Sequence, residues 1–565
     1  MSHSVSHESS AGVVAAATAT PVRSGSATRA ANEAIASATL ANRTAHGFAW
    51  LLAQTIGSKL VGIVGQSVLA WLLMPADLGV WAMVMVVMGF TGLIQQAGIR
   101  ETLIHRHRTF HLWANSAFWM TVALGCVAAV VTAALAWPVA WLFHEPRLFG
   151  LLLVVALTAP LQSLDLVAET KLQIQSRFGL IAGSKWVMTV SQLALQVLFA
   201  ALGFGAYSFV LPLPIIAVAR LVWLWTAARP PVRWGGWQTG RWRFLVNNSA
   251  IVFVSNLFMQ IQWQGDYIVL GLLFAKPIVG LYFFAFNLST HTMQLFTGSL
   301  AGVLFPALSK LQGDPRRQLK AFLDATQLLA MVAVPLCVLQ VAAADPGVRL
   351  VFQDHKWEAA IPVLQALSIG MAFRVVASPG GSLIQAQGRF RVILLTNILN
   401  VAFFIPLVLV AALVSDPVSP NWWWHPATTV GISVAVYFAI IGPIFLYVAI
   451  RPAEGTVRDL WRVYAAPMAC SIVAGAAAMY LATWVPADKV RGHRWAQGVR
   501  LTTVVVWFVV IYVPLIRLTA PDAWRALVGR IVALYRGRRN GGAGFPVVPP
   551  STATASVPTA APARS

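Results

Sequence analysis

The chain has 565 residues, of which 58% are hydrophobic and only 10% charged, and its mean hydropathy is +0.72. These values exclude an ordinary soluble globular protein and indicate an integral membrane protein. In a soluble chain, the formal charge of +22 would favour a nucleic-acid partner. Here the basic residues lie between apolar runs, so the expected partner is the lipid bilayer and no nucleic acid is expected.

In chain order, the first predicted element is a disordered cytoplasmic tail over residues 1–47, which lacks the sustained apolar stretch of a signal peptide. Apolar runs long enough for the ~30 Å hydrocarbon core follow it. They predict an all-α polytopic membrane protein with about fourteen transmembrane helices, at 48–74, 79–99, 112–143, 148–170, 180–203, 205–226, 247–273, 278–306, 321–344, 360–386, 391–414, 427–450, 461–484 and 498–518. Residues 519–565 are predicted to be a basic and then disordered cytoplasmic tail.

The distribution of Lys and Arg predicts the orientation of these helices. Basic residues concentrate in every second loop, as expected of cytoplasmic loops when both termini lie in the cytoplasm. The loop 485–497 departs from this pattern, and it follows the twelfth helix. The sequence therefore predicts a multi-pass membrane protein with cytoplasmic N- and C-termini.

Two similar segments indicate an internal duplication. MPADLGVWAMV (74–84) and AKPIVGLYFFA (275–285) are each followed by FTG and a basic loop, six helices apart. Chance similarity is the alternative explanation. A parallel repeat predicts an N-lobe of helices 1–6 (48–226), a basic linker (227–246) and a C-lobe of helices 7–12 (247–450), with two extra helices over 451–518.

Lys59 stands near the centre of the first apolar run, about 16 Å along the helix from Phe48, so its ammonium group does not reach either surface comfortably. A charge at this depth is costly and usually faces protein or a water-filled cavity. The same helix carries Gln66 and several small residues. We interpret Lys59 and Gln66 as the wall of a substrate-binding cavity, with a structural salt bridge of Lys59 as the alternative.

Two further charges lie within predicted helices. Arg374 precedes Pro379-Gly380-Gly381, which should break the helix, and broken helices beside buried charges are typical of transport sites. Asp266 lies among glutamines in the seventh helix, where it could balance a cation, bind a coupling ion (H⁺ or Na⁺) or hold the two lobes together.

Other polar residues support weaker interpretations. Asp165 and Glu169 lie near the inner surface and form either a gate or a solvated face. The three cysteines lie inside apolar runs, which favours neither disulfides nor zinc, and IHRHRTFH (104–111) carries no acidic or Cys ligand. The sequence predicts no metal and no cofactor other than the coupling ion. It also lacks the P-loop, GxSxG, HExxH and dinucleotide-binding motifs of enzymes.

Several segments resemble one family of transporters in order and spacing over residues 48–450. The chain resembles the polysaccharide transporter, or Wzx-type, lipid-linked oligosaccharide flippases of the multidrug/oligosaccharidyl-lipid/polysaccharide exporter superfamily. The similarity lies in LLMPADLGVWAMVMVVMGFTGLIQQAGIRETLIHR (72–106), the FW of SAFWM (116–120), KLQIQSRFGLI (171–181), GFGAYSFVL (203–211), GDYIVLGLLFAKPIVGLYFFAFNL (265–288), LFPALSKLQGD (304–314) and GRFRVILLTNILNV (388–401).

This resemblance implies two six-helix lobes around a central cavity and a location in the bacterial inner (plasma) membrane. It also implies alternating access that moves a polyprenyl-diphosphate oligosaccharide from the inner to the outer leaflet. It also implies roles for Lys59, as a cation for the diphosphate, and for Asp266. The chain departs from the family at Trp71, where an Arg is frequent, and at Gln262 or Gln264, where a basic residue often precedes the Asp. The polysaccharide polymerase and export machinery are the expected protein partners.

Two other functions compete with a flippase, which would not be an enzyme. A membrane polymerase or ligase of the same pathway would need a sizeable outer loop with acidic, Arg or His groups, and the largest here, 345–360, is short. A cation-coupled multidrug exporter would share the fold but favour an acidic and aromatic cavity. The basic lining predicted from Lys59 and Arg374 favours an anionic substrate.

Overall fold

The computed structural model describes residues 57–529, apart from residue 60, residue 176, residue 418, residue 420 and the stretches 97–98, 101–102, 104–108, 233–249, 353–354 and 485–492. The predicted tail 1–47 lies outside the described residues, as do most of the linker 227–246 and of the tail 519–565. Residues 521–529 form a helix that was not predicted.

All regular elements of the described chain are helices. The N-terminal part contains the helix Gly57–Leu72, called the first helix below, followed by α2 (Pro75–Gln96), α4 (Phe110–Leu142), α5 (Arg147–Ser163), α6 (Leu166–Ile174), α7 (Phe178–Ala201), α8 (Tyr207–Val210) and α9 (Pro212–Ala228). The C-terminal part contains α11 (Ala250–Leu273), α12 (Lys276–Ser309), α13 (Pro315–Val351), α14 (Ala360–Ala377), α15 (Pro379–Ala386), α16 (Phe390–Val414), α17 (Pro426–Ile450), α18 (Val457–Thr483) and α19 (His493–Thr519), with short helical turns at Trp422–Trp424 (η2) and Arg451–Ala453 (η3).

Each predicted span coincides with a helix or with two consecutive helix segments of the described chain. The break predicted at Pro379 is present, because α14 ends at Ala377 and proline opens α15. Ten helices of the described residues are long and apolar enough to cross a membrane. The all-α membrane fold is therefore confirmed, and the count of fourteen crossings stays a prediction.

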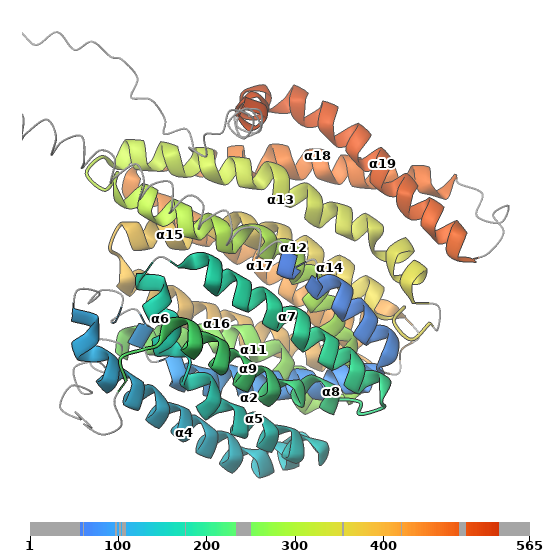
Figure 1. Ribbon diagram of the computed structural model, residues 1–565. Helices are drawn as coiled ribbons and strands as arrows, with labels where there is room; N and C mark the ends of the chain where they lie inside the picture. The colour runs from blue at the N-terminus through green and yellow to red at the C-terminus, as the bar shows by residue number, and fades with distance from the viewer. Residues whose placement is uncertain are drawn as a thin grey trace, which may run out of the picture.

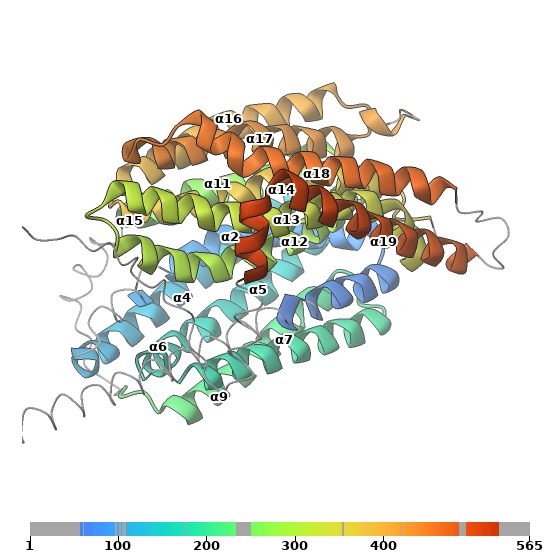
Figure 2. The ribbon, with the colours of Figure 1, turned by 90° about the horizontal axis from the view of Figure 1, so that it is seen from above.

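The helices form two groups in space. Figure 2 shows α4, α6, α7 and α9 on one side of the molecule and α13 to α18 on the other, with α2 and α12 between them. We use N-lobe for residues 57–228 and C-lobe for residues 250–450. In Figure 1, α18 and α19 lie along α13 on the side away from α4 and α5. Large apolar side chains such as Trp141 and Leu413 are exposed on the outside, as suits a lipid-facing surface.

The two lobes meet where α2 and α12 begin, which we call the Pro75 end; the opposite end, where α2 leads to Arg100, is the Arg100 end. Gly79 packs against the backbone of Lys276 and Gly280, and Gly280 packs against the backbone of Pro75 and Gly79. A side chain at either glycine would overlap a backbone carbonyl of the other helix. This contact is reciprocal, and its residues occupy matching positions in the two similar segments, as an internal duplication would require.

A turn between α13 and α14 also joins the lobes at the Pro75 end. The Trp357 indole N–H donates to the Ala70 carbonyl oxygen at 2.9 Å, and the Lys356 ammonium donates to the carbonyl oxygens of Trp71 and Leu73 at 3.0 and 3.2 Å. The last carbonyls of a helix have no partner within it. The C-lobe therefore completes the hydrogen bonding of the first helix, and Trp357 is fully buried in doing so.

Candidate functional site

A polar seam runs between the first helix and α12. The Lys59 ammonium donates to the Gln294 side-chain oxygen. About two turns further along the first helix, the Gln66 side-chain amide donates to the Phe284 carbonyl oxygen at 3.1 Å. The Gln66 side-chain oxygen lies 3.1 Å from Nε2 of His291. Lys59 and Gln66 are seven residues apart and thus share a helix face. The structure places both predicted residues at the boundary between the lobes.

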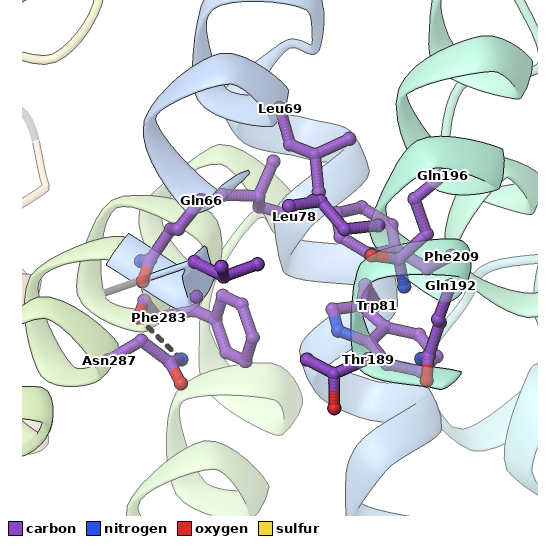
Figure 3. A pocket seen from close by; sticks show the side chains of 13 residues that line it. Gln66, Leu69, Leu78, Trp81, Thr189, Gln192, Gln196, Phe209, Phe283 and Asn287 are labelled. Atoms are coloured by element: carbon purple, nitrogen blue, oxygen red, sulfur yellow. Dashed lines mark hydrogen bonds between the residues drawn. The ribbon is translucent and has the colours of Figure 1, made fainter. Parts of the chain in front are cut away.

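A cavity of about 260 Å³ opens beside this seam, between the first helix, α2, α7, α8 and α12. Amide, hydroxyl and aromatic side chains line it together with aliphatic ones. Figure 3 shows Gln66, Phe283 and Asn287 on one side and Trp81, Thr189, Gln192, Gln196 and Phe209 on the other. The lining consists of Val61, Gly62, Gln66, Leu69, Leu78, Trp81, Thr189, Gln192, Leu193, Gln196, Phe209, Phe283 and Asn287, all uncharged.

Lys59 lies just beyond this cavity on the same helix face. It precedes the lining residues Gly62 and Gln66 by three and seven positions, which keeps all three on one side of the first helix. The contacts of Gly57 with Trp186 and of Gly65 with Leu193 set the first helix parallel to α7. The ammonium group therefore stands at the Arg100 side of the cavity.

Arg374 occupies a separate position in the C-lobe. Its guanidinium carbon lies 3.7 Å from the ring centroid of Trp263 on α11 and 4.5 Å from that of Phe438 on α17. Such stacking stabilises a cation through the electron-rich ring faces and leaves the N–H groups at the edge of the guanidinium free to bind an anion. Among the described residues Arg374 makes no hydrogen bond or ion pair, and its side chain is only partly buried.

Asp266 is enclosed between α11 and α12. The Tyr282 hydroxyl donates to one carboxylate oxygen at 2.6 Å and the Tyr267 backbone N–H to the other at 2.9 Å. The residue is 1% exposed, and Arg374 is the cation that acts on it electrostatically. Asp266 and Arg374 thus both lie in the C-lobe and within electrostatic range of each other, although the described residues show no direct ion pair between them.

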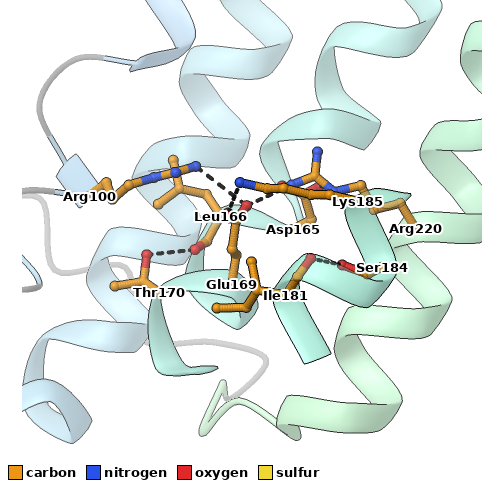
Figure 4. Close-up of polar contacts among 9 residues, drawn as sticks. All are labelled: Arg100, Asp165, Leu166, Glu169, Thr170, Ile181, Ser184, Lys185 and Arg220. Carbon is orange, nitrogen blue, oxygen red and sulfur yellow. Dashed lines mark hydrogen bonds and ion pairs between the residues drawn. The ribbon is translucent and has the colours of Figure 1, made fainter. Parts of the chain in front are cut away.

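Asp165 and Glu169 belong to a charged cluster within the N-lobe (Figure 4). The Glu169 carboxylate lies 2.6 Å from Arg220, 3.1 Å from Lys185 and 3.5 Å from Arg100, and Asp165 lies 3.2 Å from Arg220. The Glu169 side chain is 1% exposed, whereas those of its three cations are 29–40% exposed. The cluster therefore joins α6, α7 and α9 to Arg100, which follows α2 in the chain, through a buried acid and presents cations outward.

The sequence did not point to every polar residue of these sites. The three cations around Glu169 come from three separate parts of the chain, and only the presence of Arg220 inside an apolar run of the sequence gave a signal. The amides of α7 could have been found from their spacing, because Thr189, Gln192 and Gln196 recur at helical intervals in an otherwise apolar segment. Within the described residues His, Cys, Asp and Glu form no group of three or more that could hold a metal ion.

Comparison with known proteins gives consistent matches. The profile of a family described as "Polysaccharide biosynthesis protein" matches residues 68–362. The succinoglycan biosynthesis transport protein ExoT of Rhizobium meliloti (strain 1021) is 25% identical over 410 residues, which cover 71% of this chain and 82% of the relative. The lipopolysaccharide biosynthesis protein WzxC of Escherichia coli (strain K12) is 22% identical over 421 residues, covering 72% and 82%.

The fold is also similar to that of a solved transporter. The lipid II flippase MurJ, in an inward closed conformation, superimposes with a TM-score of 0.64 at 12% identity, over 84% of this chain and 99% of the other. At this identity the match establishes the architecture of the helices.

Proposed function

The chain belongs to the polysaccharide biosynthesis protein family, and we propose that it is a flippase that moves a polyprenyl-diphosphate-linked oligosaccharide repeat unit from the inner to the outer leaflet. The repeat unit would serve exopolysaccharide, capsule or O-antigen synthesis. The names of the relatives, one a succinoglycan transport protein and one a lipopolysaccharide biosynthesis protein, support this assignment. The similarity of fold to a lipid II flippase supports alternating access between two lobes.

The polar seam at Lys59 is the observation that carries the proposal. A diphosphate with sugars does not cross ~30 Å of hydrocarbon unaided, because its charges and hydroxyl groups are too costly to bury. The protein must replace their water shell inside the membrane. A cation between the lobes, next to a cavity lined with amides, supplies this replacement where both lobes can reach the substrate. In this proposal Lys59 binds the diphosphate, and Gln66 holds the adjoining wall.

Arg374 and Asp266 act as a second unit in the C-lobe. The stacked guanidinium of Arg374 keeps its N–H groups available for a phosphate oxygen. Asp266 balances this charge when no substrate is bound and is the candidate group for a coupling ion, H⁺ or Na⁺. A cation near the substrate path favours an anionic lipid-linked sugar over the cationic substrates of a drug exporter.

Asp165 and Glu169 brace the Arg100 end of the N-lobe. All of their ion-pair partners in the described chain lie in the N-lobe, so the cluster keeps these helices together as one body while the lobes move. This geometry favours bracing over the two predicted roles, a gate or a solvated face. In the proposed orientation the Arg100 end and both termini face the cytoplasm, the substrate enters from the inner leaflet, and polymerase and export machinery take it over outside.

The test uses the cells in which the protein works. A deletion strain is complemented with the wild-type chain, with Lys59→Ala, with Arg374→Ala or with Lys310→Ala, the last removing an exposed lysine at the end of α12 as a control. We expect the first two variants to reach the membrane but to lose surface polysaccharide, while lipid-linked repeat units accumulate. In spheroplasts these repeat units should be protected from a membrane-impermeant oxidant of sugars such as periodate.

The location of the accumulated lipid separates the competing functions. A polymerase or ligase would leave single repeat units on the outer leaflet, where periodate oxidises them. Normal surface polysaccharide in both the Lys59→Ala and the Arg374→Ala strains would reject the two residues as substrate ligands. Normal polysaccharide in the deletion strain itself would reject the flippase assignment.

A further inference from the structure

The cavity beside Lys59 has a chemistry that differs from the anion-binding role of that residue. Its polar lining consists of amide and hydroxyl groups, and none of the lining residues is charged. An amide both donates and accepts hydrogen bonds, as a sugar hydroxyl does. The volume of about 260 Å³ lies just below the usual range for ligand pockets. It suits one sugar ring with its hydroxyl groups and not a whole repeat unit.

Two of the amides are free to bind a ligand. Gln66 is already held by Phe284 and His291. Gln192 and Gln196 make no hydrogen bond with any described residue, although they line the cavity on a helix within the apolar bundle. Both side chains are only partly buried, so their amide groups are accessible to a ligand in the cavity.

The free amides belong to a continuous polar stripe on α7. Lys185, Thr189, Gln192 and Gln196 are spaced by four, three and four residues and therefore share one face of the helix. Figure 3 shows the last three on the same side of the cavity as Trp81. The outward-facing positions of α7, such as Val187 and Leu198, are exposed and apolar. The stripe thus follows the cavity and not the lipid.

An aromatic wall stands next to these amides. The Trp81 ring stacks on Phe209 with a centroid distance of 5.1 Å and an interplanar angle of 7°, so Phe209 holds one face of the indole in place. Both rings line the cavity. The apolar C–H face of a pyranose packs well on a fixed aromatic ring while its hydroxyl groups reach out to hydrogen-bonding side chains. Trp81, Gln192 and Gln196 together offer both kinds of contact.

The separation between Lys59 and the free amides matches the arrangement of the substrate, in which a sugar follows the diphosphate. Lys59 precedes Gln66 by seven residues, which corresponds to about 10 Å along the first helix. Because the first helix is parallel to α7, with Gly65 next to Leu193, the level of Gln66 on the first helix is the level of the free amides on α7. A diphosphate at Lys59 would therefore place the sugar attached to it inside the cavity.

We infer that this cavity is a glycan subsite, in which Gln192, Gln196 and Trp81 bind an uncharged pyranose attached directly to the diphosphate. The inference rests on the proposed flippase function and adds a substrate class to it. The uncharged lining selects a neutral sugar over a uronic acid, because a carboxylate would find no cation among the lining residues.

The experiment measures binding to the purified full-length chain in detergent, by native mass spectrometry or thermal shift. The probes are undecaprenyl diphosphate, the same lipid carrying a single neutral hexose (glucose or galactose), and the same lipid carrying glucuronic acid. We expect the wild-type chain to bind a neutral hexosyl lipid about tenfold or more tightly than the bare diphosphate, since two added amide hydrogen bonds have this order of effect. Binding of the glucuronyl lipid should not exceed that of the bare diphosphate.

Variants connect this preference to the named side chains. The double variant Gln192→Leu/Gln196→Leu should bind all three lipids equally and keep the wild-type affinity for the bare diphosphate, which also reports that it is folded. Ser191→Ala, on the same helix but outside the cavity lining, should retain the preference, and Lys59→Ala should lose affinity for every lipid. An undiminished preference in the double variant, or a preference for the glucuronyl lipid, would overturn the subsite. Failure of the wild-type chain to bind any of the lipids would instead count against the flippase.

Discussion

The contact between Gly79 and Gly280 predicts how the conformation of the molecule can be shifted. A methyl group at Gly280 would overlap the carbonyl oxygen of Pro75, and one at Gly79 would overlap that of Lys276. Both obstacles are backbone atoms, which cannot rotate away as a side chain does. Gly280→Ala should therefore push α2 and α12 apart at the Pro75 end and favour the conformation in which the lobes have separated there.

The size of the effect follows from the cost of overpacking. An added methyl in a tight contact costs about 1–3 kcal/mol. The gain in helix propensity from Gly to Ala is present in both conformations and does not change their ratio. At about 1.4 kcal/mol for each factor of ten, the ratio of separated to closed molecules should rise by about 5- to 150-fold. The rigid backbone contact places the expected value toward the upper part of this range.

Distance measurement between two spin labels would report the separation. Leu202 directly follows α7 and Leu413 lies near the end of α16, and both side chains are exposed, at 63% and 67%. After replacement of the native cysteines, labels at these two positions should show a longer distance population in Gly280→Ala than in the parent protein. Gly92→Ala is the matched control, because Gly92 also lies in α2 but its added methyl would meet open space.

An unchanged distance distribution in Gly280→Ala, or an equal change in Gly92→Ala, would refute this reasoning. Gly79→Ala gives an independent check, because the contact is reciprocal and should respond in the same direction from either side.

Three further substitutions test the packing of the lobes. Trp357→Phe removes the hydrogen bond to the first helix and should lengthen the same label distance, with a loss of about 1 kcal/mol from the closed state. Tyr282→Phe leaves a buried oxygen of Asp266 without its side-chain donor, which should cost about 1–3 kcal/mol and lower the midpoint of thermal unfolding in detergent. An unchanged midpoint would contradict this hydrogen bond. Glu169→Gln removes the negative charge that Arg220 and two other cations surround, and it should lower the free energy of unfolding by about 3 kcal/mol. Adding Arg220→Gln should restore part of this stability, whereas substitutions at independent sites would give additive losses.

The fold was predictable because the membrane restricts the choices. Apolar runs of sufficient length must form helices, as every backbone polar group in the bilayer needs a partner within the segment. The helix break at Pro379 was also predictable, because proline has no backbone N–H to continue the hydrogen bonds of the preceding helix. The similar segments around Gly79 and Gly280 were also visible in the sequence, but their direct contact depends on how the two lobes pack and could not be read from either segment alone.

The partners of the charged residues were beyond prediction for a related reason. Lys59 finds Gln294 and Asp266 finds Tyr282 through the rotation and packing of α11, α12 and the first helix, which hydropathy leaves undetermined. The sequence identified the charges as exceptional because their burial is costly, whatever their neighbours. It could not show that Arg374 would belong with Asp266 and not with Lys59.

The hydrogen bonds from Lys356 and Trp357 to the first helix also have a consequence for biosynthesis. Their acceptors lie near residue 70, whereas the donors are made almost three hundred residues later. Protein chains emerge and fold from the N-terminus onward. The end of the first helix must therefore remain provisionally solvated or covered by another protein while most of the chain is inserted, and it reaches its final hydrogen bonding only after the second half arrives.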